Sequence, residues 1–459
     1  MTGSRCFHAV ARDRGWTDTP ACHARSVRTV ALVCVLALGA TTARGDDDPL
    51  AALLARTDAV AKEVAKVRGL RLKTKIPNEV VDRAELKKRL LAEASEDKTA
   101  ADTAAHGISL QRWGLVPLDY DYAAQLVDLL ADQIAGYYDS KTKKLTILDT
   151  AGGDPAWAEM VLAHELDHGL QDQAFDLDKF EKVADDDSDA LNARHALVEG
   201  DGVALMIEVM LAREGITNPW AVPEAADEVI QAMAAPDQAT KDSLDDSPLA
   251  IREEMLFPYR DGFAFVTALR RTKPWSAIDA AFRRPPRSTE QILHVDKYLA
   301  DDKPIPVKVE SSPVADYKVL TTDVWGELGM RSFLRAHGVS PIVAENAAAG
   351  WGGDRVITLA HDGEKNARRT IGIARFEWDT EVDAREAQAA LEHAVDDMMI
   401  GSFEQTMERT RSWNLDGTVS WVERRDKSVV LVIGAPMQLA DKLDPWTTLT
   451  ASARGRRAG

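Results

Sequence analysis

The sequence predicts an α+β protein, in which a larger, mainly helical domain with a short β-hairpin precedes a smaller C-terminal α+β domain. Apolar residues recur at helical spacing through most of residues 108–299. Within that stretch, two short β-prone runs at 136–148 flank a polar Asp-Ser-Lys-Thr turn, which is typical of a hairpin. The order expected further along the chain is that of an α+β unit, with a strand, a helix and two strands at 371–378, 384–403, 418–423 and 428–433.

Length and composition limit the classes of function. The chain has 459 residues, enough for two or three domains with a sizeable core. Its apolar content of 45% and charged content of 28% are ordinary for a soluble globular protein. The formal net charge of −18 argues against nucleic acid or an anionic membrane surface as the main partner.

Residues 1–43 are predicted to be a secretory signal peptide. Arg25 and Arg28 precede an apolar run at 30–40, and the small residues 41–43 follow it. The run is too short to span a bilayer comfortably, so we expect an exported protein, periplasmic or extracellular, without a stable membrane span after cleavage. All three cysteines lie in this leader, which leaves the remainder without a disulfide or a thiolate metal site.

The chain after the leader is expected to form four segments. They are an N-terminal helical segment at 44–107, the larger domain at 108–303, a proline-flanked linker at 304–313 and the C-terminal α+β domain at 314–459. In the first segment, Pro77 separates two predicted helices, the second at about 78–96. In the larger domain, helices are expected at about 156–172 and 190–214.

Two short motifs are interpreted as structural. The acidic run at 185–189 lacks the glycine-punctuated, alternating spacing of a calcium loop, so we expect a solvated charge run. Trp351-Gly352-Gly353-Asp354 invites a binding-site interpretation, but a tight turn before a strand at 355–359 accounts for it equally well and is preferred.

The chemistry is expected at the pentapeptide 164–168, His-Glu-Leu-Asp-His. On a helix, residues at i and i+4 share one face, so the imidazoles of His164 and His168 can bind one metal ion, with Glu165 beside its water. Zinc takes neutral imidazole nitrogens at about 2.0–2.1 Å and, for catalysis, needs a third protein ligand and an open position. Chance can produce this spacing, but the apolar back face of the helix favours one zinc site per chain.

Glu199 is the leading candidate for the third ligand. It lies in an apolar helix 31 residues after the pentapeptide, and ionised carboxylates are seldom buried unless they are paired or bound to metal. Small residues at Gly200 and Gly202 would let the two helices approach closely. Two alternatives stay open: His195, one turn earlier on the same face, could be the ligand, or Glu199 could pair with Arg194 or be exposed.

Metal-binding histidines normally donate their second ring nitrogen to a carboxylate or a carbonyl. Asp172, Asp176 and Asp201 are candidates for that role, and the sequence does not choose among them. The remaining carboxylate of the pentapeptide, Asp167, is expected to face solvent.

His164-Glu165-x-x-His168 with a downstream helical Glu199 resembles the gluzincin group of zinc metallopeptidases. Residues 163–173 and 196–202 are more closely similar to an uncharacterised family of exported bacterial HExxH proteins. Further stretches similar to that family lie at 137–139, 257–262, 285–294 and 351–354, so the resemblance covers most of the chain after the leader. Of these similar stretches, only the two helical motifs at 163–173 and 196–202 are specific for a catalytic site. Asp167 departs from the threonine or small apolar residue more usual in such motifs, and Gly202 stands where alanine is usual, which should matter little.

The resemblance implies a zincin-like domain at 108–303 that hydrolyses peptide bonds of a protein or peptide substrate, with Glu165 as the general base on a zinc-activated water. A tetrahedral oxyanion also needs a donor, and the candidates are Tyr137, Tyr138, Tyr259, Arg260 and His294. An extended substrate could add as a strand to an edge at 145–148.

Two alternative functions remain. One is a catalytically idle, zinc-stabilised scaffold whose C-terminal domain binds a partner or the cell envelope, and the other is hydrolysis of a non-peptide bond. Glu165 favours catalysis, because a purely structural zinc site does not need a base. The sequence does not indicate an oligomeric state.

Overall fold

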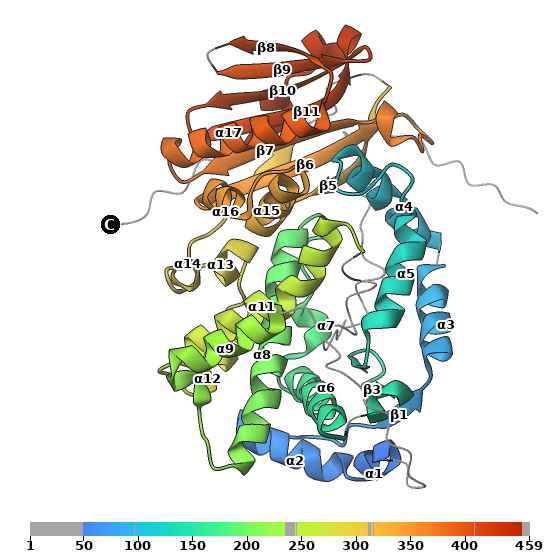
Figure 1. The fold of residues 1–459 in the computed structure, drawn as a ribbon, viewed down its shortest axis with the longest axis vertical. Coiled ribbons are helices and arrows are strands. Elements are labelled where there is room, and N and C mark those ends of the chain that lie inside the picture. Colours follow the sequence, from blue (N-terminus) through green and yellow to red (C-terminus); the bar gives the residue numbers. More distant parts are fainter. Residues whose placement is uncertain are drawn as a thin grey trace, which may run out of the picture.

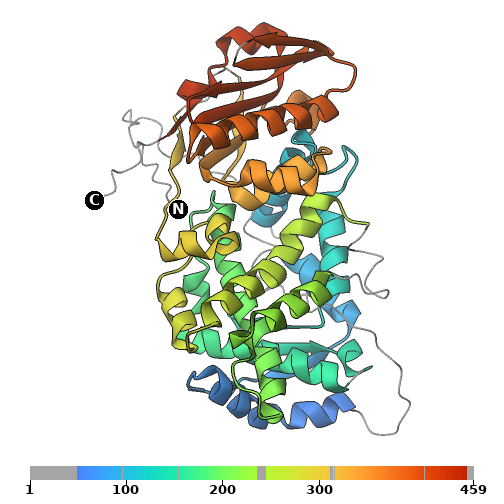
Figure 2. The ribbon, with the colours of Figure 1, turned by 60° about the vertical axis from the view of Figure 1, so that its left-hand side comes forward.

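The computed structural model describes residues 49–451, except 96, 154, 235–243, 245, 311–313, 315 and 408. The predicted signal peptide, 1–43, lies outside this range. No helix in the described part combines the length and the apolar character needed to cross a bilayer. The predicted α+β class is confirmed: a mainly helical part is stacked end to end on a seven-stranded antiparallel sheet (Figure 1 and Figure 2).

The N-terminal elements belong to the main hydrophobic core of the helical part. They are α1 (Pro49–Ala55), α2 (Thr57–Arg68), β1 (Asn78–Val81), α3 (Arg83–Ala94), α4 (Asp97–Arg112) and α5 (Tyr122–Gln133). The expectation of a helix from residue 78 is wrong, because β-branched Val80 and Val81 favour a strand and Asp82 caps α3 through the N–H of Glu85. Helix α4 runs across the boundary expected at 107.

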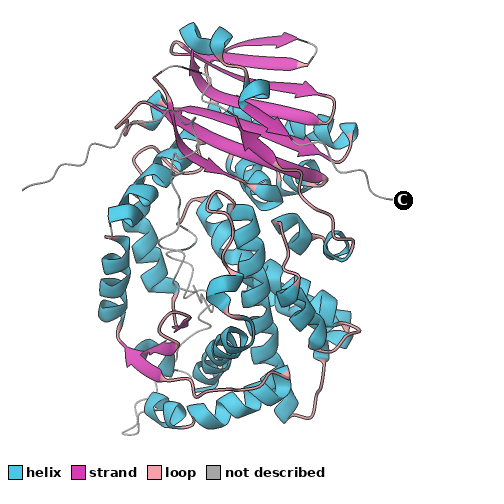
Figure 3. Cartoon of the chain, turned by 180° about the vertical axis from the view of Figure 1, so that it is seen from behind, coloured by secondary structure: helices cyan, strands magenta, loops and turns pink. Residues whose placement is uncertain are grey.

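The predicted hairpin is confirmed, and a third strand joins it. Strands β2 (Gly136–Asp139) and β3 (Lys144–Leu148) pair antiparallel, while β1 pairs parallel with the other side of β3. The order is therefore β1-β3-β2, and β3 lies in the centre of this small sheet. The small sheet lies at the opposite end of the molecule from the seven-stranded sheet (Figure 3). The expected free edge at 145–148 is wrong, since both sides of β3 are already paired. The edge that packs against the next helix is β2.

Three long helices form the centre of the helical part: α6 (Pro155–Phe175), α8 (Ser188–Arg213) and α11 (Leu249–Arg270). The first two confirm the helices expected at 156–172 and 190–214. Shorter helices surround them: α7 (Leu177–Phe180), α9 (Pro223–Ala234), α12 (Ser276–Arg283), α13 (Thr289–Leu293) and α14 (Val295–Leu299).

Gly200 of α8 lies against α11 rather than against α6. A Cβ added to Gly200 would lie 2.1 Å from the carbonyl carbon of Gly262, so only glycine allows this crossing. We expect Gly200→Ala to lower the free energy of unfolding by about 3 kcal/mol, at the upper end of overpacking effects. Chemical denaturation measures this, with Gly107→Ala as the control, since its Cβ would approach only the Tyr122 side chain, at 3.2 Å. Equal stabilities of the two variants would contradict the prediction.

The C-terminal sheet has the order β5-β6-β7-β11-β10-β9-β8. Its strands are β5 (Lys318–Asp323), β6 (Trp351–Ala360), β7 (Ile371–Trp378), β8 (Phe403–Met407), β9 (Thr410–Leu415), β10 (Thr418–Arg425) and β11 (Ser428–Pro436). One face packs against α15 (Gly326–Ala336), α16 (Pro341–Ala348) and α17 (Glu381–Met398). The other face packs against β4 (Val307–Val309), which lies in the expected linker, and β12 (Leu449–Ala451); α18 (Pro445–Thr448) precedes β12.

Trp351–Asp354 does not form the expected turn but opens strand β6. A bulge shifts the strand register between Trp351 and Gly353. Gly353 has φ +156°, and a Cβ there would lie 2.2 Å from the backbone oxygen of Ile305. The glycine thus serves a close backbone approach, while Asp354 accepts hydrogen bonds from the backbone N–H groups of Trp325 and Gly326.

The acidic run at 185–189 is not solvated throughout, as was expected. Asp187 caps α8 by accepting a hydrogen bond from the N–H of Ala190. Asp189 is buried and accepts hydrogen bonds from both the backbone N–H and the hydroxyl of Thr289. Asp187 therefore caps the start of α8, and Asp189 joins α8 to α13.

Candidate metal centre

Helices α6 and α8 bring together three side chains that could hold a metal ion: His164, His168 and Glu199. Nε2 of His164 lies 3.2 Å from Oε2 of Glu199, and Nε2 of His168 lies 3.5 Å from the same oxygen. The two Nε2 atoms are 3.0 Å apart. All three side chains are fully buried. Among the described residues, this is the one group of three or more potential ligands whose donor atoms converge in this way.

The spacing of the three donor atoms fits a small divalent metal ion. Ligands at about 2.0–2.1 Å in a tetrahedral site lie about 3.3–3.4 Å from one another. The three separations, 3.0, 3.2 and 3.5 Å, bracket that value. Two imidazoles and a carboxylate also form a donor set that first-row divalent metals accept. The residues present therefore fit a metal ion.

The pKa values of His164, His168 and Glu199 depend on one another's charges. Burial lowers the pKa of His164. Burial also acts to lower the pKa of His168, but the neighbouring Glu199 carboxylate more than offsets this and raises it to about 10. Burial acts to raise the pKa of Glu199, but His168 and the hydrogen bonds from the histidines hold it well below its usual range. A proton and a metal ion thus compete for the same group, and metal binding would release a proton.

Glu165 is fully buried next to this group. Neither carboxylate oxygen has a hydrogen-bond partner of normal geometry within the described residues, although the backbone of Tyr138 is close enough to act on its pKa. Burial raises the pKa of Glu165 to about 8, against the opposing effect of His168. A carboxyl group whose pKa lies near neutrality is well suited to proton transfer.

His195 contacts the other oxygen of the Glu199 carboxylate. Its Nε2 lies 3.3 Å from Oε1 of Glu199, so it stands behind that carboxylate and outside the three converging donors. Its side chain is 17% exposed, which marks the accessible side of the centre. A cavity of about 430 Å³ is lined by Glu181 and by Leu191, one turn before His195 on α8, but His195, Glu165 and the three potential ligands do not line it. The expected alternative pairing of Glu199 with Arg194 is wrong, because that guanidinium donates to backbone carbonyls.

The second nitrogen of His168 contacts a side-chain amide, which was not among the partners expected from the sequence. Nδ1 of His168 lies 3.0 Å from Oε1 of Gln171, one turn later on α6. The expectation that an aspartate is the direct partner is therefore wrong for this histidine. Asp201 lies one step further, accepting a hydrogen bond from Gln171, and Asp172 accepts one from the Tyr138 hydroxyl. The third candidate, Asp176, is the N-cap residue of α7.

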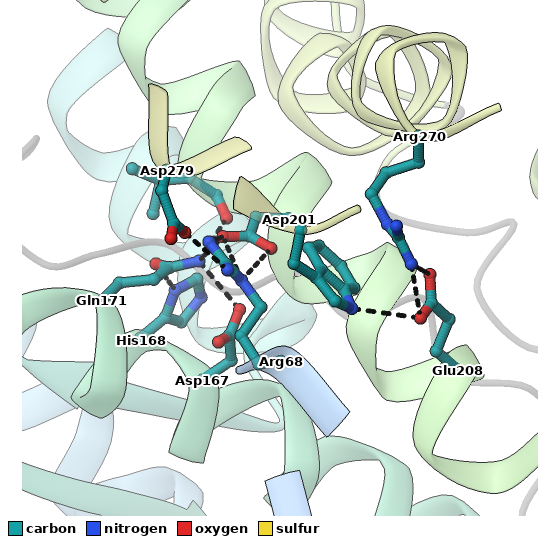
Figure 4. Close-up of polar contacts among 10 residues, drawn as sticks. Arg68, Asp167, His168, Gln171, Asp201, Glu208, Arg270 and Asp279 are labelled. Carbon is teal, nitrogen blue, oxygen red and sulfur yellow. Dashed lines mark hydrogen bonds and ion pairs between the residues drawn. The ribbon is translucent and has the colours of Figure 1, made fainter. Parts of the chain in front are cut away.

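Asp167 does not face solvent, contrary to expectation. It is fully buried and accepts a hydrogen bond of 2.9 Å from Nε2 of Gln171 (Figure 4). The cause is that α6 is enclosed on every side, with residues 161–172 buried without interruption. Burial raises the pKa of Asp167 well above its usual range, and the neighbouring Asp201 adds to this. Arg68 of α2 forms an ion pair with Asp201. Like Gln171, it was not among the site residues expected from the sequence.

Gly202 lies directly against His164. A Cβ at this position would lie 2.7 Å from Cε1 of the imidazole and 2.9 Å from Nδ1. An alanine at this position would therefore require the His164 ring to shift. The glycine here sets the distance between α8 and the first ligand.

The candidate oxyanion donors are mostly engaged elsewhere. The hydroxyl of Tyr138 donates to Asp172, and that of Tyr137 accepts a hydrogen bond from an arginine of α3. Arg260 pairs with Asp261 and Glu253, and His294 pairs with Glu327. Tyr259 is buried in α11. Among these residues, the backbone of Tyr138 is placed beside Glu165.

Comparison with known proteins concerns the C-terminal part. Residues 316–444 match the family model described as Domain of unknown function (DUF8575). Searches of curated proteins and of solved structures gave no significant match. The matched region covers the seven-stranded sheet and its helices, and the three potential metal ligands lie outside it.

Proposed function

We propose that the chain is an exported, zinc-dependent metallopeptidase in which His164, His168 and Glu199 hold the zinc ion and Glu165 is the general base. One observation carries this proposal: three donor atoms from two helices converge within 3.5 Å, with a buried carboxyl group that lacks a normal hydrogen bond beside them. Burying a carboxyl group without a hydrogen bond costs free energy, so its presence here points to a function. Export is inferred from the predicted leader at 1–43.

Zinc bound by these ligands would supply Lewis-acid activation of a water molecule and of the substrate carbonyl. Glu165 accepts the proton from the attacking water and delivers it to the leaving amine, a task for which a pKa near neutrality is suited. Glu199 and the two imidazoles come from facing helices, so the geometry of the centre is set by helix packing.

A substrate would approach from the side on which His195 is exposed. Strand β2, the edge that packs against α6, lies beside Glu165 through the backbone of Tyr138. An edge strand next to the base can pair with the backbone of an extended peptide. This arrangement supports a zincin-like helical domain and a peptide rather than a small ester as the substrate.

A zinc-stabilised scaffold without catalysis is the second candidate. The observation that favours it is the complete burial of all three ligands and of Glu165, since a structural metal site is closed. Glu165 argues against the scaffold function, because a structural metal site gains no stability from a buried carboxyl group without a hydrogen-bond partner of normal geometry.

Hydrolysis of an unfolded protein by the purified full chain tests the proposal. We expect new amino termini to appear from a reduced, carboxymethylated protein, to cease after treatment with a chelator and to return when zinc is restored. A panel of small esters and phosphoesters serves as the comparison. Cleavage of these alone would show a non-peptide hydrolase, and zinc binding without any hydrolysis would favour the scaffold.

A further inference from the structure

Arg68, the last residue of α2, is held completely inside the protein. Its side chain is 0% exposed, and Nε and Nη2 each donate a hydrogen bond of 2.9 Å to the Asp201 carboxylate. Nη1 donates to Asp279 at 2.8 Å, and the guanidinium lies 4.6 Å from the ring centre of Trp275. A fork-like arginine–carboxylate contact of this kind fixes the orientation of the carboxylate as well as its position (Figure 4).

The oriented carboxylate reaches Gln171. Nε2 of Gln171, which carries two hydrogens, lies within hydrogen-bond distance of three acceptors: Oδ2 of Asp201 at 3.1 Å, Asp167 at 2.9 Å and the backbone carbonyl of Val198 at 3.2 Å. A backbone carbonyl can only accept hydrogen bonds, so the NH₂ side of the amide must face this group. Turning the amide over would place its oxygen against these oxygens.

The amide orientation determines the tautomer of His168. With its NH₂ side held, Gln171 presents Oε1 to Nδ1 of His168 at 3.0 Å, so Nδ1 must carry the proton. Nε2, which points to His164 and Glu199, then keeps its lone pair for a metal ion. The partner of one ring nitrogen decides what the other can bind.

We propose that Arg68 is a positioning residue of the metal centre: by clamping Asp201 it fixes the Gln171 amide, which holds His168 in the tautomer that binds metal through Nε2. The inference rests on the proposed zinc site and makes α2 part of it. The sequence had placed this helix in a separate segment, 44–107.

The chain offers a matched control in Arg270. Its side chain is 5% exposed, it donates hydrogen bonds of 2.8 and 2.9 Å to the two oxygens of Glu208, and it lies 4.4 Å from the same Trp275 ring centre. The hydrogen bonds of Arg270 and Glu208 within the described residues do not extend to Gln171 or to the three ligands (Figure 4). Both arginines are therefore buried and paired with a carboxylate, but only Arg68 is connected to His168 through hydrogen bonds.

Arg68→Lys and Arg270→Lys retain the charge but remove the planar fork. We expect both variants to lose similar thermal stability as metal-free proteins. The zinc Kd, measured by competition with a chromophoric chelator, is expected to rise about tenfold in Arg68→Lys and to change less than about twofold in Arg270→Lys. The absorption spectrum of the cobalt-loaded protein should change only in Arg68→Lys. An unchanged zinc Kd in Arg68→Lys, or equal rises in both variants, would overturn the inference.

Gln171→Met tests the last step of the same path without altering a buried charge, and it decides the matter if Arg68→Lys does not fold. We expect its zinc Kd to rise about 10- to 100-fold. The double variant Arg68→Lys/Gln171→Met is expected to bind zinc no more weakly than Gln171→Met alone, because both substitutions act on the same path. Zinc binding by Gln171→Met within twofold of the wild type would overturn the inference. A wild type that binds no zinc would instead contradict the proposed function itself.

Discussion

Glu165→Gln is expected to lower the rate of peptide hydrolysis by about a thousandfold while the protein still binds one zinc ion. The substitution keeps the shape of the side chain and removes the group that accepts the proton from water. It also removes a buried carboxyl group without a normal hydrogen bond, so the folded protein should be at least as stable. Initial rates on a protein substrate, measured beside the zinc content of the same sample, give both quantities.

Glu208→Gln is the matched control for this variant. Glu208 is a buried glutamate of α8, paired with Arg270 outside the three ligands. We expect it to retain activity within about twofold for the fraction that is folded. If Glu165→Gln kept a tenth or more of the wild-type rate, the assignment of the general base would be wrong.

Glu199→Ala is expected to raise the zinc Kd by about a hundredfold or more. Structural zinc sites bind with about 10–16 kcal/mol shared among four ligands, so one ligand accounts for roughly 2.5–4 kcal/mol, or about 70- to 900-fold in Kd. The geometry supports this choice, because Oε2 of Glu199 lies 3.2 and 3.5 Å from the two imidazole nitrogens. Equilibrium dialysis against buffered zinc measures the difference.

His195→Ala separates the two candidates for the third ligand. His195 contacts only Oε1 of Glu199, so its removal should change the zinc Kd by no more than about tenfold, the lower end of effects from residues that orient a ligand. The reverse result, zinc lost in His195→Ala and retained in Glu199→Ala, would exchange the roles of these residues.

Local patterns in the sequence predicted the elements that depend on local interactions. Helices α6 and α8 follow from apolar spacing, and the β2–β3 hairpin follows from two β-prone runs around a polar turn. Strand β1 was missed because its partner lies far along the chain, at 145–148. The same long-range pairing placed β3 in the centre of the sheet and removed the edge expected there.

The residues of the candidate site also differ in whether local sequence or long-range packing determines their roles. His164 and His168 are identified by their spacing on one helix, and Glu199 by an ionisable residue in an apolar helix. Gln171 and Arg68 could not be identified, since their roles arise only where α2, α6 and α8 meet.

Asp167 shows why one sequence rule failed at this site. A charged side chain is normally expected at the surface, but α6 has no exposed face around the pentapeptide. The carboxyl group instead shares the Gln171 amide with Asp201.

Metal analysis of the full chain as purified, by mass spectrometry of the dissolved protein, tests the central claim most directly. The account predicts one zinc ion per chain, removed by a chelator, regained on dialysis against zinc and absent from Glu199→Ala. A folded wild type that carries no stoichiometric metal, and takes up none from buffered zinc, would contradict it.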